Sequence, residues 1–302
     1  MGISFQEVSH YYPGPKRKQI TIALDDINLE ISDKDEFIAI VGKTGSGKST
    51  LIQHMNALKL PSKGNVKVFD SVITPKKNKN PKLKKIRKRV GFVFQFPEYQ
   101  LFEETVLKDI MFAPLNFGFS KEDAKKNAIK TLKLLHIEKI ANKSPFSLSG
   151  GQMRKVAIAG ILSYSPDIIL LDEPTRGLDP KGGEEIMEIF YNLHKETHKT
   201  FVMITHDMDI VYKYATRVIV LNDTKITFDG NTEDLFSSDI YKNNHLSKPE
   251  VLKLIDYLNE KNNYNLDYKT HTLEELLEKL KEVAWWISPS DNMCLVIVGY
   301  IN

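Results

Sequence analysis

The sequence has one cysteine and no long hydrophobic run, and each scarcity excludes a class of protein. Cys294, the only cysteine among 302 residues, can form no intrachain disulfide and cannot build a zinc site alone, which suits a reducing compartment. A membrane span needs about 20 consecutive apolar residues. The apolar stretches are much shorter: Val156–Leu162, Ile168–Leu171 and Met293–Ile301. We therefore expect no membrane-crossing segment.

A secretion signal and a strong charge imbalance are also missing. The first residues lack a basic stretch followed by an apolar one, so we expect a cytosolic chain. The formal net charge of +3 is too small to indicate a nucleic-acid partner by itself. A hydrophobic fraction of 41% with 27% charged residues is typical of a soluble globular protein. Because one core stops growing at about 250 to 300 residues, we expect two or three subdomains.

A glycine loop follows the apolar run Phe37–Val41 and leads into Leu51–Met55. This order predicts a buried strand, a phosphate-cradling loop and the N-terminus of a helix, whose N–H groups and dipole favour an anion. Lys48 is predicted to reach the β- and γ-phosphates of a nucleotide, and the Ser49 hydroxyl to bind Mg²⁺. The loop consists of Gly42, Lys43, Thr44, Gly45, Ser46, Gly47, Lys48, Ser49 and Thr50.

Two segments before and after this loop leave alternatives open. Residues 1 to about 34 alternate apolar and polar side chains, which predicts half-buried strands. Tyr11 and Tyr12 either pack on that sheet or stack on an adenine, and the residues alone favour packing. A basic run between residues 76 and 89 is read first as a solvated face, with anionic lipid headgroups as the better alternative and nucleic acid as the least favoured.

A helical insertion is predicted from about residue 96 to 165. It follows the strand Val90–Phe94, which ends at Gln95, a residue placed to reach a metal or an attacking water. The insertion includes a helix over 121–135 after the N-cap Ser120. It closes with a second anion-binding element that opens a helix over 153–162: Ser149, Gly150, Gly151 and Gln152. Two phosphate-binding elements suggest two chains, each offering its second element to the other's ATP.

Two more buried strands end in reactive side chains. Ile168–Leu171 precedes Asp172, predicted to hold Mg²⁺, and Glu173, predicted to polarise the attacking water as general base. The strand over 201–205 ends at His206, which could contact the γ-phosphate or orient the water. Four other histidines are interpreted as structural: His136, His194, His198 and His245. From about residue 235 the sequence contains no catalytic constellation; Val251–Leu258 and Leu273–Val283 have helical spacing, with Thr272 and Glu275 as a capping box. The final apolar run, Met293–Val298, fits either a strand or an apolar tail that favours contacts with other surfaces.

The order of these motifs resembles the nucleotide-binding subunit of ABC transporters over about residues 1–235. The resemblance implies an α/β fold: a P-loop NTPase (RecA-like) core with an N-terminal antiparallel β-subdomain, an inserted helical subdomain and a small C-terminal accessory module over 236–302. It also implies that Tyr12 stacks on adenine, which reverses the preference above, and that Asp179 lies in a loop crossing a dimer interface.

A narrower resemblance links the chain to energy-coupling factor (ECF) importers, and most closely to the second of their two ATPase types. It rests on the segments 94–106 and 148–160. It implies a heterodimer with a second ATPase subunit, peripheral attachment on the cytoplasmic face of the cell membrane, a transmembrane coupling subunit, and a substrate-binding membrane subunit specific for a vitamin or metal ion. Arg176 departs from the small residue usual at its position and could alter contacts across the dimer.

The function expected is therefore MgATP binding and hydrolysis that drive a membrane partner through the segment from Gln95 to Thr105. The main alternative is a soluble ABC ATPase acting on nucleic acid or ribosomes, although such proteins usually carry two cassettes or a long coiled-coil insertion, and neither is evident. A third possibility, a non-hydrolysing regulatory module, is disfavoured by the presence of Glu173 and His206.

Overall fold

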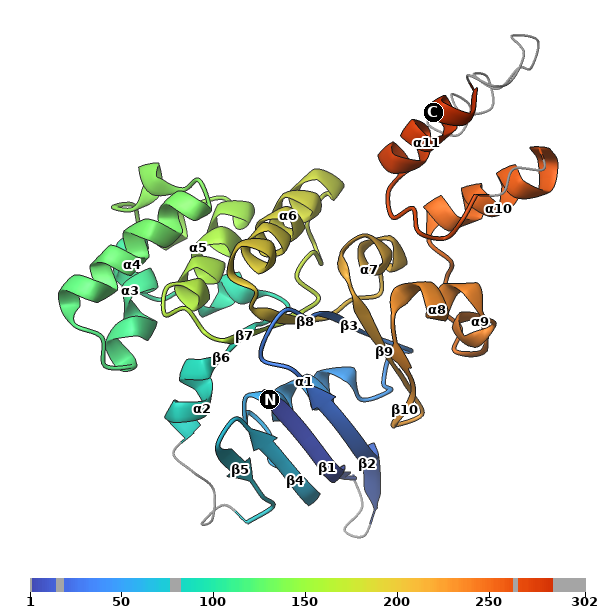
Figure 1. Cartoon of the computed structure of the whole chain (residues 1–302). Coiled ribbons are helices and arrows are strands. Elements are labelled where there is room, and N and C mark those ends of the chain that lie inside the picture. The colour runs from blue at the N-terminus through green and yellow to red at the C-terminus, as the bar shows by residue number, and fades with distance from the viewer. Residues whose placement is uncertain (1, 15–18, 77–82, 263–265, 285–302) are drawn as a thin grey trace. The chain divides into compact units, whose positions relative to one another are not determined.

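The computed structural model describes residues 2–14, 19–76, 83–262 and 266–284 (Figure 1). The chain divides into two compact units, Met1–Leu246 and Ser247–Asn302. The boundary predicted at residue 235 falls inside helix α8 (Thr232–Ser237). The predictions for Cys294 and for the tail after residue 284 lie outside the described residues, as does the part of the basic run over 77–82.

A six-stranded sheet forms the centre of the first unit. Its order is β10-β9-β3-β8-β7-β6, and every neighbouring pair is parallel except β9 with β10. Strands β3, β7 and β8 are mostly apolar and almost entirely buried, as expected of parallel strands covered on both faces. The carboxyl ends of the five parallel strands therefore share one edge. The strands are β3 (Phe37–Val41), β6 (Val90–Val93), β7 (Ile168–Asp172), β8 (Thr200–Ile204), β9 (Arg217–Asn222) and β10 (Lys225–Gly230).

A second, antiparallel sheet confirms the predicted N-terminal β-subdomain. Its order is β2-β1-β4-β5, formed by β1 (Ile3–Pro13), β2 (Ile20–Ile31), β4 (Lys63–Val68) and β5 (Ser71–Ile73). Helix α1 (Lys48–Met55) lies between the two sheets (Figure 1). Buried side chains of both sheets and of α1 form one hydrophobic cluster, so the glycine loop before α1 is held from both sides.

The insertion between β6 and β7 is helical, as predicted. It contains η2 (Pro97–Gln100), α3 (Val106–Asn116), α4 (Lys121–Leu134), η3 (Glu138–Ile140), η4 (Pro145–Ser147) and α5 (Gly150–Leu162), and α2 (Leu83–Arg89) precedes β6. Ser120 caps α4, as expected. The start predicted for α5 at Met153 was wrong, because Ser149 forms a capping box with Gln152 and the helix begins at Gly150.

Four more helices complete the first unit: α6 (Pro180–Thr197), α7 (Met208–Tyr214), α8 and α9 (Ile240–Asn243). The second unit contains the two predicted helices, α10 (Glu250–Asn262) and α11 (Leu273–Ala284), each with buried leucines. Thr272 accepts the Glu275 N–H, but the Glu275 carboxylate accepts the N–H of His271, so the predicted capping box is half formed.

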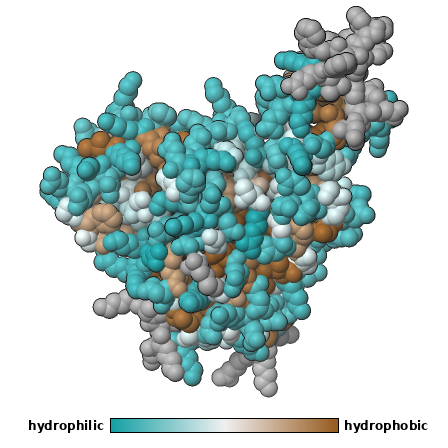
Figure 2. All heavy atoms as spheres, in the orientation of Figure 1, coloured by the Kyte–Doolittle hydropathy of each residue, from teal (hydrophilic) through white to brown (hydrophobic). Residues whose placement is uncertain are grey.

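The described part of the chain contains no helix long and apolar enough to cross a bilayer. Hydrophilic residues dominate the face seen in Figure 2, and hydrophobic residues emerge between them in small separate groups.

Candidate functional site

The glycine loop between β3 and α1 has a backbone that other residues could not adopt. Gly42, Gly45 and Gly47 have φ values of 137°, 85° and 106°. A Cβ at Gly42 would lie 1.9 Å from the carbonyl oxygen of Leu221, and one at Gly47 would lie 2.2 Å from that of Ala23. Gly45 instead borders open space. The backbone of β9 therefore packs closely against the loop at Gly42, and that of β2 at Gly47, whereas the space beside Gly45 is open to a ligand.

The N-terminus of α1 offers donors that no side chain occupies. Its N-cap is Gly47, with no side-chain cap hydrogen bond, whereas α3, α4, α5 and α6 are each capped by an oxygen-bearing side chain. The buried ammonium of Lys48 donates to the carbonyls of Gly42 and Lys43, both at 2.7 Å. Burial lowers the pKa of Lys48, although the negative charges of Glu173 and Asp172 act to raise it. Free N–H groups and a cation at one helix end form an anion site.

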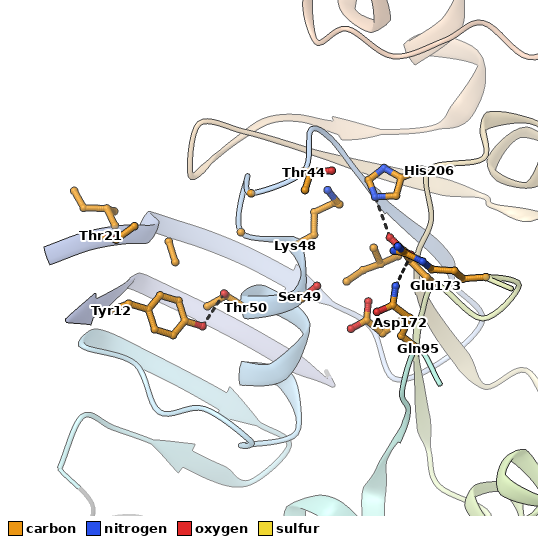
Figure 3. Close-up of a pocket in the computed structure, with 16 residues that line it drawn as sticks. Tyr12, Thr21, Thr44, Lys48, Ser49, Thr50, Gln95, Asp172, Glu173 and His206 are labelled. Atoms are coloured by element: carbon orange, nitrogen blue, oxygen red, sulfur yellow. Dashed lines mark hydrogen bonds and ion pairs between the residues drawn. The ribbon is translucent and has the colours of Figure 1, made fainter. Parts of the chain in front are cut away.

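A pocket of about 420 Å³ opens at this end of α1 (Figure 3). That volume suits a small-molecule ligand. Predicted residues from five segments line it: Tyr12, Thr44, Gly45, Gly47, Lys48, Ser49, Thr50, Gln95, Asp172, Glu173 and His206. The lining also includes residues that the sequence did not suggest for it: Thr21, Ile22, Ala23, Arg176 and Ile204.

Tyr12 forms one wall of the pocket. Its hydroxyl lies 3.1 Å from the Thr50 hydroxyl, and the Lys59 ammonium lies 4.8 Å from the ring centroid. Ile22 of β2 pairs with Tyr11 and is 44% exposed. The first part of β2 thus presents apolar surface to the pocket beside Tyr12, which could pack on a flat base.

Glu173 lies at the opposite end of the pocket, just past the end of β7. Its φ of 48° is in the left-handed region, uncommon for a residue with a side chain and often associated with functional sites. Its Oε2 accepts hydrogen bonds from Gln95 Nε2 at 2.8 Å and Arg176 Nη1 at 2.7 Å. His206 Nε2 lies 2.9 Å from its Oε1. The structure therefore brings Gln95, Glu173 and His206 together (Figure 3), and Arg176 joins them through its hydrogen bond to Glu173.

The environments of the two neighbouring carboxyl groups differ. Burial, with a contribution from the Glu173 charge, raises the pKa of Asp172 to about 6, although Lys48 opposes the rise. Burial also acts to raise the pKa of Glu173, but the donors Arg176 and Gln95 and the charge of His206 outweigh it, so that pKa is lowered. Carboxyl groups whose pKa values are pushed apart are typical of sites with two chemical roles.

Three side chains with oxygen atoms border the pocket between its ends. They are the Ser49 hydroxyl, the Gln95 amide and the Asp172 carboxylate. Hard oxygen donors with one carboxylate fit Mg²⁺ bound together with substrate phosphates. Among the described residues no group of three His, Cys, Asp or Glu side chains is placed to hold a metal ion.

The other predicted site residues do not line the pocket. Gly42, Lys43 and Ser46 belong to the loop behind it, and Lys43 and Gly42 supply the carbonyls that hold Lys48. The second anion element, Ser149, Gly150, Gly151 and Gln152, begins α5, and Asp179 caps α6 by accepting the Gly182 N–H at 2.7 Å.

A protein-family profile described as "ABC transporter" matches residues 24–176. Several relatives are named energy-coupling factor transporter ATP-binding protein EcfA2. The one from Geobacillus kaustophilus is 45% identical over 96% of this chain and 100% of its own length. The one from Enterococcus faecalis is 49% identical over 93% of this chain and 96% of its own.

Solved structures of ABC transporter proteins are also similar to this chain. The cbiO1 protein of Clostridium perfringens, described as part of the ABC transporter complex cbiONQ, superposes with a TM-score of 0.69 and 32% identity, covering 86% of this chain and 95% of its own. The ATP-binding cassette MJ0796, solved as a dimer in a post-hydrolysis state with ADP and Pi, gives a TM-score of 0.66 and 34% identity, covering 76% of this chain and 98% of its own.

Proposed function

This chain belongs to the ABC transporter ATPases, and among them to the ATP-binding proteins of energy-coupling factor transporters; from that premise we propose how its residues bind and hydrolyse ATP. It is an ATP-hydrolysing subunit of an importer of this type. The alternative of a soluble ATPase acting on nucleic acid or ribosomes is disfavoured, because the relatives named above are transporter proteins.

In the proposed complex the nucleotide lies along the pocket from Tyr12 to Glu173. The Tyr12 ring stacks on adenine, and its hydroxyl is held by Thr50. The loop N–H groups and the start of α1 bind the phosphates. Lys48 exchanges its two carbonyl acceptors for phosphate oxygens, for which it is already placed at the pocket wall. The fit rests on the open space at Gly45 and the uncapped end of α1.

Ser49, Gln95 and Asp172 are proposed to hold Mg²⁺. When bound, the ion neutralises phosphate charge that develops during phosphoryl transfer. Burial raises the pKa of Asp172, and a divalent cation bound beside it would favour the ionised carboxylate.

Glu173 is proposed as the general base for the attacking water. Its lowered pKa keeps it ionised at neutral pH, and its left-handed backbone directs the carboxylate to the same place as Gln95 and His206. His206 orients the water or contacts the γ-phosphate, and Gln95 moves with the segment that follows it. The contact between Glu173 and Gln95 is the observation that carries this assignment.

Because Ser149, Gly150, Gly151, Gln152 and Asp179 lie outside the pocket, we propose that they serve the ATP of a second chain. A first turn of α5 with two glycines leaves N–H groups open to an anion from outside. The second chain is proposed to be a similar but non-identical ATPase, so that the working unit is a heterodimer with two shared sites.

The segment after Gln95 is proposed to contact a transmembrane coupling subunit. Tyr99 is 84% exposed and Phe102 is 55% exposed, and the Phe102 ring packs edge-on against Phe112 at 4.7 Å. Exposed aromatic side chains on a rigid helical support are typical of protein interfaces. Through that subunit and a separate substrate-binding membrane subunit, the chain would act as a peripheral protein on the cytoplasmic face and power uptake of a vitamin or metal ion.

Replacing the base tests this function. Glu173→Gln is expected to abolish ATP turnover, because the amide cannot accept the water proton, while ATP binding persists and a closed dimer accumulates. Steady-state hydrolysis, nucleotide affinity and dimer size would be measured together.

Two further variants calibrate this result. Lys48→Ala should weaken nucleotide binding itself. Glu196→Gln, on the exposed part of α6, should change neither quantity. Turnover at the wild-type rate in Glu173→Gln would rule out Glu173 as the base, and unchanged affinity in Lys48→Ala would refute the phosphate site.

A further inference from the structure

Arg154 is a buried side chain of the helical insertion whose guanidinium makes hydrogen bonds to several other residues. It lies in the second turn of α5, and only 3% of its surface is exposed. Its Nε and Nη2 donate to the two carboxylate oxygens of Glu98 at 3.2 and 3.1 Å. Nη2 also donates to the carbonyl of Gln95 at 3.2 Å, and Nη1 donates to the carbonyls of Arg176 at 2.7 Å and Pro174 at 3.5 Å. The guanidinium thus uses all of its nitrogens.

The acceptors come from both sides of the Gln95–Glu173 contact. The side chain of Gln95 donates to Glu173, while its carbonyl accepts from Arg154. Pro174 directly follows Glu173, whose backbone has the unusual positive φ, and its carbonyl accepts from the same guanidinium. Arg154 therefore holds the main chain at Gln95 and at Pro174, the residue after Glu173, by hydrogen bonds to backbone carbonyls.

Glu98 orients this guanidinium. Its two oxygens engage one edge of the planar group, which leaves Nη1 and the second proton of Nη2 directed at the carbonyls. The Glu98 side chain is 14% exposed, so the ion pair is largely shielded from solvent. A lysine could supply the charge but not the planar fork that reaches residues 95–98 and 174–176 at once.

We propose that Arg154, oriented by Glu98, is a positioning residue for ATP hydrolysis that sets the geometry of Gln95 and Glu173. The inference rests on the proposed function of Glu173 as base. Arg154 lies on α5, the helix whose N-cap is Ser149. Glu98 lies in η2, within the segment proposed to contact the membrane partner. If that partner displaced η2, the Glu98 carboxylate would move with it. The buried Arg154 side chain would then transmit the movement to the main chain next to Glu173.

The pair is tested with Glu98→Gln in the full-length chain assembled with its co-purified partner subunits. The amide keeps the size of the carboxylate but removes the charge that holds the guanidinium. Because neither Arg154 nor Glu98 lines the pocket, the KM for ATP should stay within about twofold, while kcat falls on the order of tenfold. Arg154→Lys should likewise lower kcat and leave the KM for ATP nearly unchanged. It provides a second variant if one of the two fails to assemble.

Glu185→Gln is the matched control. Glu185 accepts from Lys155, the next residue on α5, at 2.6 Å, so the variant removes one ion pair from the same helix without touching the segments of Gln95 or Pro174. It should retain wild-type kcat. Wild-type kcat in Glu98→Gln, a change confined to KM, or an equal loss of kcat in the control would overturn the positioning role. Absence of hydrolysis in the unmodified complex would instead count against the proposed function.

Discussion

Arg176 is the residue at which the site departs from the pattern that its motifs predict. A small residue was expected there, yet the guanidinium donates to Glu173 at 2.7 Å and lines the nucleotide pocket. Gln95 donates to the same carboxylate oxygen. A donor that carries a positive charge stabilises the ionised carboxylate more than a neutral one does. Arg176 therefore keeps the proposed base ionised at lower pH.

Removing this cation should move the pH dependence of hydrolysis. Arg176→Ala withdraws a donor and a charge that lower the pKa of Glu173, so that pKa rises and the acidic limb of the kcat profile shifts to higher pH. The measurement is kcat for ATP across the acidic range. Arg176→Lys keeps the charge and should keep most of the wild-type profile. An acidic limb that does not move in Arg176→Ala would show that Arg176 does not tune the base.

At the scale of elements, the N-terminus of α5 has two tasks. The Ser149 hydroxyl accepts the Gln152 N–H, and the Gln152 side chain accepts the Ser149 N–H, so the capping box stabilises the helix within this chain. The same turn is proposed to bind a phosphate of the partner's nucleotide. A simple alanine substitution would mix these two effects.

Alanine and glycine at this position separate the effects. Ser149→Ala should cost about 1 kcal/mol of the free energy of unfolding, whereas Ser149→Gly should cost only a few tenths of a kcal/mol, because glycine is tolerated as an N-cap. If the hydroxyl serves the shared site, both should lose ATPase activity alike, on the order of a hundredfold. Urea unfolding and ATPase assays supply the readouts.

Ser120→Ala controls for capping alone. Ser120 caps α4 with the same hydroxyl-to-N–H contact, at 3.0 Å to Asp123, far along the sequence from any predicted phosphate element. It should lose stability as Ser149→Ala does and retain activity. Activity that follows stability across all three variants would remove the need for a phosphate contact at Ser149.

The elements that sequence patterns predict well are those with short-range signals. Aliphatic runs that end in polar residues identified β3, β7 and β8, and parallel pairing then had to bring Glu173 and His206 to one edge. The environment of Arg154 could not be predicted, because its acceptors lie 20 to 59 positions away in the sequence and include three backbone carbonyls. The contribution of Ile22 to the pocket could not be predicted either, because the alternation of β2 does not show which of its side chains lie beside the glycine loop.

At the scale of the whole molecule, every residue that lines the nucleotide pocket belongs to the first unit. The Arg154 contacts also lie entirely within it. The second unit has its own internal contacts: Lys248 pairs with Asp256, and Tyr268 donates to the same carboxylate. Leu252, Ile255, Leu276 and Leu280 are buried on its two helices. The chain therefore separates a nucleotide-binding unit from a module that we propose to be accessory.

A chain that ends at Leu246 tests this separation. Since the pocket draws on no residue after that point, the truncated protein should bind ATP with an affinity within about twofold of the full chain and unfold in one cooperative transition. Calorimetric titration with ATP and urea unfolding provide the two measurements, and Lys48→Ala in the truncated chain confirms that any binding still uses the glycine loop. A truncated chain that folds but binds ATP much more weakly would mean that the second unit supports the pocket. In that case the accessory role would have to be replaced by a direct part in nucleotide binding.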